Sequence, residues 1–171
     1  MNPAAWGVIG TAVGALASIG TTWLTNRNSA NLQASGKAAE RLETQRAFQR
    51  QTLLELQDAF HDAIRLVARV NIEDCKAERE GTPWGRNYLP DDLSEDARLA
   101  NRRVMLLVER ISDESLRKQI KSVMALANSV TQSGSRAEAE QRLDQATFQS
   151  VAAIEQSGAV LRSLYDVAGA R

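Results

Sequence analysis

Cysteine and proline are both scarce in this sequence. The single cysteine, Cys75, cannot form a disulfide bond within the chain, which excludes a small fold stapled by such bonds. Its place in a helical pattern predicts a buried and unreactive thiol. The only prolines among the 171 residues are Pro3, Pro83 and Pro90. Because proline is the strongest helix breaker, a chain with so few can form long helices.

Histidine is equally scarce, since His61 is the only one. Asp58 and His61, with Glu55 and Asp62 nearby, resemble half of the carboxylate and Glu-x-x-His pattern of metal-binding bundles, which needs two histidines on facing helices. A Ser or Cys nucleophile would also depend on this one histidine. Walker A and dinucleotide-binding glycine motifs are absent. We therefore predict no enzymatic activity and no metal or other cofactor.

Neither sign of charge is in excess, because Lys and Arg together number 21 and so do Asp and Glu. This balance argues against a nucleic-acid partner, which would favour a basic chain. Nothing in the sequence indicates a small-molecule substrate. With 171 residues, the chain has room for one domain of about 100 to 150 residues and a further segment.

The strongest signal is an uncharged stretch, residues 4–24 (AAWGVIGTAVGALASIGTTWL). A helix of this length, rising about 1.5 Å per residue, would cross the roughly 30 Å hydrocarbon core of a bilayer. Trp6 and Trp23 lie near its ends, where indole rings favour the headgroup region. We therefore predict a transmembrane anchor in contact with membrane lipid. A cleaved signal peptide, with Ala15 and Ala17 as an A-x-A site, and a buried core helix are the alternatives.

Small residues collect on one side of this helix when residues are placed at 100° steps. This side includes Gly7, Gly10, Gly14, Ser18 and Thr21. Gly10 and Gly14 match the GxxxG spacing, and helices in lipid associate where small side chains let their backbones approach closely. We predict that this face packs on a second copy or on another membrane protein. The alternative is a helix that crosses the membrane alone.

Basic residues follow the uncharged stretch. Residues 26–50 contain Arg27, Lys37, Arg41, Arg46 and Arg50 against Glu40 and Glu43, whereas residues 1–3 contain no Lys or Arg. The positive-inside rule then predicts an inner-membrane protein with its N-terminus outside and its C-terminal domain in the cytoplasm. The expected parts are an anchor (4–24), a basic juxtamembrane neck (25–50) and a helical domain (51–171).

Helical periodicity becomes clear after a polar stretch at residues 26–37 and predicts a long helix over 38–79. The residues expected to face a core are Leu53, Leu56, Phe60, Ala63, Val67 and Val70. Its first turns have little to bury, which suggests a stalk or coiled-coil neck. The sequence Glu80-Gly81-Thr82-Pro83 is a typical helix stop.

Three further helices are expected. Ser94 is a candidate N-cap for the first, Asp113 for the second, and Ser135 with Glu138 forms a capping box for the third. The residues expected to face inward are Leu99, Val104, Leu107, Val108 and Ile111, then Leu116, Ile120, Val123, Met124, Ala127 and Val130, and finally Leu143, Thr147, Val151, Ile154, Leu161, Tyr165 and Ala168. The short connections favour an all-α, antiparallel bundle of three or four helices.

One loop, residues 81–93, joins the first two helices of this domain. It contains Trp84, Arg86 and Tyr88, and such side chains are favoured as anchors of protein interfaces. We interpret the loop as a candidate partner-binding site. In the alternative interpretation, Trp84 and Tyr88 fold back and cap one end of the bundle.

The segment GVIGTAVGALASIGTTWLTNR and the layout behind it resemble uncharacterised bacterial single-pass small proteins, which have a Gly/Ala-rich N-terminal membrane helix and a cytoplasmic helical domain. This resemblance covers the anchor and neck and implies no activity or site. Two functional hypotheses follow from the residues. One is a non-enzymatic, membrane-tethered interaction module that self-associates through its small-residue face. The other is a phage-related or defence-related effector that oligomerises to permeabilise the bilayer.

Overall fold

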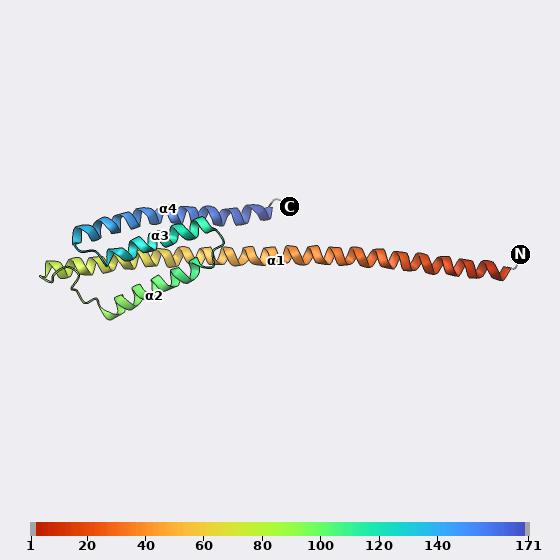
Figure 1. The fold of residues 1–171 in the computed structure, drawn as a ribbon, viewed down its shortest axis with the longest axis horizontal. Helices are drawn as coiled ribbons and strands as arrows, with labels where there is room; N and C mark the ends of the chain where they lie inside the picture. The colour runs from red at the N-terminus through yellow and green to blue at the C-terminus, as the bar shows by residue number, and fades with distance from the viewer. Residues whose placement is uncertain (1–2, 170–171) are drawn as a thin grey trace. The chain divides into compact units, whose positions relative to one another are not determined.

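The computed structural model describes the backbone of residues 3–169 and the side chains of Ser29, Gln33 and residues 35–166. Over this range the chain is helical without strands, in the order α1 (Pro3–Arg79), α2 (Asp91–Val108), α3 (Glu114–Val130) and α4 (Arg136–Gly169) (Figure 1). The all-α prediction is therefore confirmed. The chain divides into two compact units, residues 1–45 and 46–171.

The predicted transmembrane segment lies outside the described side chains. This applies to the expected packing face (Gly7, Gly10, Gly14, Ser18 and Thr21) and to the expected interface aromatics (Trp6 and Trp23). Within the described residues, no helix combines the length and apolar character that a membrane span needs.

Helix α1 begins well before residue 38, where the sequence predicts its start. The polar stretch at residues 26–37 is part of the same helix, and Gly36 does not interrupt it. Glycine costs only about 1 kcal/mol in a helix interior, and the Ala, Glu, Arg and Leu residues that follow are strong helix formers. Residues 35–45 are exposed, apart from a half-buried Ala39.

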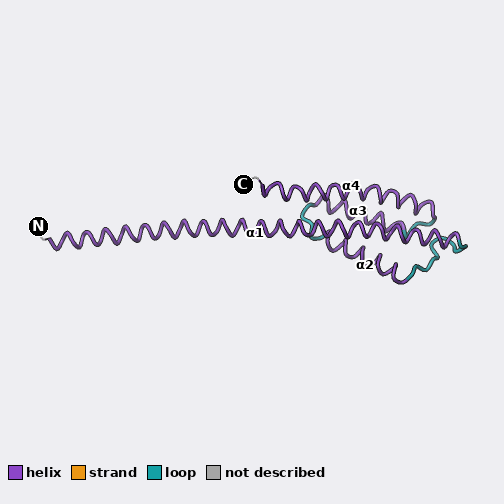
Figure 2. The backbone as a smooth tube through the Cα atoms, turned by 180° about the vertical axis from the view of Figure 1, so that it is seen from behind, coloured by secondary structure: helices purple, strands orange, loops and turns teal. Residues whose placement is uncertain are grey.

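The second unit is a bundle in which each helix runs antiparallel to the next. The α1–α2 and α3–α4 connections lie at one end and the α2–α3 connection at the other (Figures 1 and 2). All the predicted core residues of α1 and α3 are buried: Leu53, Leu56, Phe60, Ala63, Val67, Val70, Leu116, Ile120, Val123, Met124, Ala127 and Val130. Most of them form the main core with α2 residues such as Val104 and Val108. Val67, Ala127 and Val130 belong to a second buried cluster, and Val70 belongs to a third.

The helix starts follow the predicted caps in part. Asp113 caps α3, because its Oδ1 accepts a hydrogen bond from the Leu116 backbone N–H at 2.7 Å. Ser135 Oγ accepts from the N–H of Glu138 at 3.3 Å, and the Glu138 carboxylate accepts from the N–H of Gly134 at 2.8 Å. The prediction for Ser94 is wrong. Helix α2 begins at Asp91, directly after Pro90, so the connecting loop is shorter than residues 81–93.

The inward face of α4 also differs from the prediction. Its buried residues are small: Ala139, Ala146, Ser150, Ala153 and Ser157. Of the large residues expected there, Val151 and Tyr165 are exposed with Thr147, while Leu143, Ile154 and Leu161 are half-buried and Ala168 lies outside the described side chains. Small side chains let the α4 backbone approach its neighbours closely, so the helix turns its Ala/Ser stripe inward rather than its bulky one.

Candidate functional site

The loop between α1 and α2 is held by glycine geometry and backbone hydrogen bonds. Gly81 has φ of 95° and the N–H of Thr82 donates to the Ala77 carbonyl at 2.9 Å, as expected where a helix ends in a left-handed residue. Gly85 has φ of 73°, and the N–H of Arg86 donates to the Pro83 carbonyl at 3.1 Å. The loop thus has a defined turn that fixes where its aromatic side chains lie.

Trp84 is tied to the end of the bundle. Its Nε1–H donates to the Ser133 carbonyl at 2.9 Å, and its ring packs against the cluster formed by Val67, Ala127, Val130 and their neighbours. The indole therefore links the two loops at this end. Trp84 therefore caps this end of the bundle, as the alternative interpretation of the loop predicts.

Tyr88 and Arg86 behave differently from Trp84. Tyr88 is 97% exposed, and Arg86 is also exposed. The loop therefore does not gather the three candidate residues into one site. Trp84 fixes the loop to the bundle, whereas the side chains of Tyr88 and Arg86 lie in solvent.

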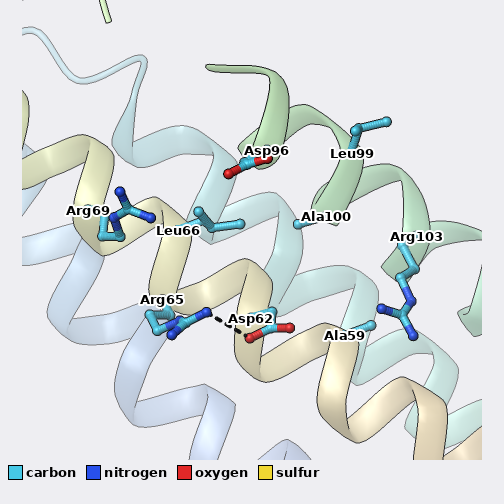
Figure 3. Close-up of a pocket in the computed structure, with 9 residues that line it drawn as sticks. All are labelled: Ala59, Asp62, Arg65, Leu66, Arg69, Asp96, Leu99, Ala100 and Arg103. Atoms are coloured by element: carbon cyan, nitrogen blue, oxygen red, sulfur yellow. Dashed lines mark hydrogen bonds and ion pairs between the residues drawn. The ribbon is translucent and has the colours of Figure 1, made fainter. Parts of the chain in front are cut away.

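A groove between α1 and α2 is a feature that the sequence patterns do not predict. It has a volume of about 260 Å³ and is lined by Ala59, Asp62, Arg65, Leu66, Arg69, Asp96, Leu99, Ala100 and Arg103 (Figure 3). A neighbouring hollow of about 350 Å³ shares Leu99 and Arg103 and extends to Leu106 and Arg110. The groove has a leucine and alanine floor and charged walls.

Most of the groove's arginines are not engaged by the carboxylates beside them. Arg65 pairs with Asp62 at 3.2 Å within α1. Among the described residues, Arg69 and Arg103 form no ion pair, and neither does Asp96. Opposite charges thus face each other across the groove without closing it (Figure 3).

The shifted pKa values belong to surface ion pairs and not to this groove's interior. A hydrogen bond from Arg98 lowers the pKa of Glu95, and one from Lys121 lowers the pKa of Glu109. Asp58 and His61 are both exposed. Within the described part of the chain, no group of three or more His, Cys, Asp or Glu side chains is placed to hold a metal ion. Cys75 is a buried free thiol, as predicted.

The missed residues had a readable signal. Arg102, Arg103 and Leu106 lie three, four and seven residues after Leu99, which places an Arg/Leu stripe on one side of α2. We assigned Leu99 to the core because it fits the apolar periodicity, yet it is exposed. No protein-family model matches the chain, and no curated protein or solved structure shows significant similarity to it.

Proposed function

We propose that this protein is a non-enzymatic, membrane-tethered interaction module. The uncharged stretch at residues 4–24 carries the proposal, and its continuity with the bundle through the single helix α1 supports it. A bilayer would accept such a stretch as a helix because all its backbone groups are hydrogen-bonded internally. The basic residues that follow support an orientation with the bundle on the cytoplasmic side of the inner membrane.

The module self-associates within the membrane through the face made by Gly7, Gly10, Gly14, Ser18 and Thr21. Lipid offers no hydrophobic driving force between helices, so close backbone contact at glycine and serine has to supply the attraction. The bundle then displays its surfaces, including the exposed Tyr88 and Arg86, to a protein partner.

The first test separates the anchor from peripheral association. Full-length protein is expressed in bacteria, and membranes are washed with alkaline carbonate. We expect the protein to stay in the membrane pellet, because a spanning helix resists this wash. Release into the supernatant as a monomer would overturn the proposal. Growth arrest with loss of membrane potential would instead favour a permeabilising effector.

The second test concerns the packing face. Gly10→Leu and Gly14→Leu place bulk where the backbones should meet, and we expect both to weaken association in a membrane two-hybrid assay. Ala12→Leu is the matched control, because residue 12 lies on the opposite side of the helix at 100° per residue. Equal association for all three variants would rule out the glycine face.

A further inference from the structure

Helix α2 carries apolar side chains on its outer surface as well as in the core. Leu99 is 45% exposed and Leu106 is 54% exposed, and both line the hollow of about 350 Å³ between α1 and α2. Seven residues make nearly two helical turns, so these two leucines lie on one face of the helix. They form an outer strip, distinct from the residues that α2 buries, which are Leu93, Val104, Leu107 and Val108.

Three arginines surround this strip. Arg102 and Arg103 lie three and four residues after Leu99, which places them on either side of the strip, and Arg110 follows one turn after Leu106. All three arginines line the same hollow and are exposed. Within the described part of the chain, none of them forms an ion pair. The strip therefore lies among three cationic side chains.

The carboxylates beside these arginines have other partners. Glu109 is next to Arg110 in the chain, but its Oε1 lies 2.5 Å from Lys121 Nζ on α3. Glu55 lines the hollow and accepts a hydrogen bond from Gln51 Nε2 at 2.8 Å. The hollow is therefore basic, with three arginines against one glutamate, although the whole chain has no net charge.

The neighbouring groove differs in its charges. Asp62 and Asp96 line it together with Arg65, Arg69 and Arg103 (Figure 3). An anionic ligand would meet carboxylates there as well as guanidinium groups. The basic excess thus belongs to the hollow and not to the whole surface between α1 and α2.

We propose that this hollow binds an acidic amphipathic helix of a partner protein. Such a helix can place its apolar side chains on the leucine strip while its carboxylates pair with the guanidinium groups at the rim. The face from Leu99 to Arg110 is about 16 Å long at 1.5 Å per residue, which matches about three turns of a partner helix.

A protein partner accounts for the leucines and the arginines together. A phosphate group alone would pair with the guanidinium groups but would leave both leucines in water. A second copy of this surface would set its arginines against the same arginines, which is unfavourable. The inference deepens the interaction module proposed above and rests on that module having a protein partner, whose chemical class it names.

Peptide binding to the full-length protein in nonionic detergent tests the inference. The probe is a fluorescein-labelled peptide of repeating Glu-Glu-Leu-Leu sequence, about 16 residues long, which forms an amphipathic helix. One control peptide has Lys in place of every Glu, and the other has Ser in place of every Leu. Measured against empty micelles, we expect the anisotropy to rise with the acidic leucine peptide alone. Absence of binding, or equal binding of the serine peptide, would overturn the inference.

Charge reversal tests the complementarity. Arg102→Glu combined with Arg110→Glu should weaken binding of the acidic peptide by about tenfold or more and should create binding of the lysine peptide. Arg162→Glu, on the exposed surface of α4, is the matched control and should change neither affinity. If the reversed variant bound the acidic peptide as tightly as the native protein does, the site would lie elsewhere and the inference would be lost.

The leucine strip is tested in the same assay. Leu99→Ser and Leu106→Ser should each weaken binding of the acidic peptide by about fivefold, because each removes apolar surface that the partner covers. Phe148→Ser removes an 80% exposed side chain on α4 and should have no effect. Unchanged affinity in both leucine variants would contradict the inference.

Anionic lipid is the rival occupant. Cys75→Ala and Leu106→Cys allow an apolar, environment-sensitive fluorophore to be attached at residue 106 of the full-length protein. In phosphatidylcholine vesicles, we expect the acidic peptide to shift its emission to the blue and added phosphatidylglycerol to leave it unchanged. A blue shift that phosphatidylglycerol causes and Arg102→Gln removes would identify lipid as the occupant and overturn the inference.

The anchor and this site can fail independently. If carbonate released the protein from membranes but the acidic peptide still bound with the expected dependence on arginine and leucine, the site would stand without the tether. If the protein stayed in the membrane and the peptide did not bind, only the inference about the hollow would be lost.

Discussion

Helix α1 contains two regions that share one backbone but are stabilised in different ways. Residues 35–45 are exposed almost throughout, and Thr44 Oγ1 donates a hydrogen bond to the Glu40 carbonyl one turn earlier. Residues 52–75 bury a continuous stripe that includes Leu53, Leu56 and Phe60. The first region depends on intrinsic helix propensity and the second on tertiary packing.

We therefore expect local helix stability in residues 35–45 and the stability of the bundle to be separate properties of the chain. A change in the exposed region should alter local helix opening without affecting the unfolding of the bundle. A change in the buried stripe should affect the whole bundle. The predictions below test this separation, beginning with the largest effect.

The three phenylalanines of the chain offer the sharpest contrast. Phe60 is 1% exposed, Phe48 is 52% exposed and Phe148 is 80% exposed. Phe60→Ala should lower the unfolding free energy of the bundle by about 3–5 kcal/mol, because it leaves a cavity in the core. Phe148→Ala should change it by less than about 0.5 kcal/mol. Urea unfolding followed by Trp84 fluorescence, with Trp6 and Trp23 replaced by Phe, measures both. Equal losses would contradict the assigned core.

Overpacking gives the next largest effect. Ala146 is fully buried on α4 and Ala152 is exposed on the same helix. Ala146→Leu should destabilise the bundle by about 1–3 kcal/mol, because its added atoms meet a packed neighbour. Ala152→Leu and Ala38→Leu, the latter in the exposed part of α1, should each be nearly neutral. A tolerated Ala146→Leu would mean that α4 does not pack as closely as its small-residue stripe requires.

The same contrast explains which features could be predicted from the sequence. The inward stripes of α1 and α3 can be predicted from the sequence because most of their buried residues are large and recur at helical spacing. The inward side of α4 cannot be predicted in this way, because its buried alanines and serines carry little apolar signal and its bulky residues lie on other faces of the helix. Asp113 was identified because a cap depends on local sequence, whereas Ser94 failed because α2 could start one turn earlier, after Pro90.

The candidate sites divide in a similar way. Trp84, Arg86 and Tyr88 were recognised as unusual from composition, but sequence could not show that Trp84 hydrogen-bonds the α3–α4 loop. That contact joins residues 49 positions apart, so no local pattern records it. The groove between α1 and α2 depends on two helices meeting in a particular register, which periodicity within each helix does not determine.

Two helical glycines test the separation with smaller effects. A Cβ added to Gly36 would meet no atom within 4 Å, and one added to Gly158 would meet Arg162 Nη1 at 3.4 Å. Gly36→Ala should stabilise the local helix by about 0.5–1 kcal/mol and slow hydrogen exchange nearby roughly two- to fivefold. The urea midpoint of the bundle should not move. Gly158→Ala should raise that midpoint instead. A shift of the midpoint by Gly36→Ala would show that the two regions are coupled.

The smallest effect concerns an ion pair that joins two elements of the bundle. Lys121 Nζ on α3 lies 2.5 Å from Glu109 Oε1, just after α2. The hydrogen bond from Lys121 lowers the pKa of Glu109 in the folded state. The pair therefore stabilises folding above the ordinary pKa range of glutamate, and this contribution disappears as the pH falls through the lowered value. Because both side chains are about half exposed, the effect should be small and weakened by salt. Lys121→Gln should lower the urea midpoint slightly at neutral pH and low salt, and this difference should vanish at acidic pH.

Lys118→Gln removes a pair with Glu114 within α3 and is the matched control. If both variants gave the same pH-dependent change, the contribution would be local to the helix, and the contact between α2 and α3 would add nothing to the bundle.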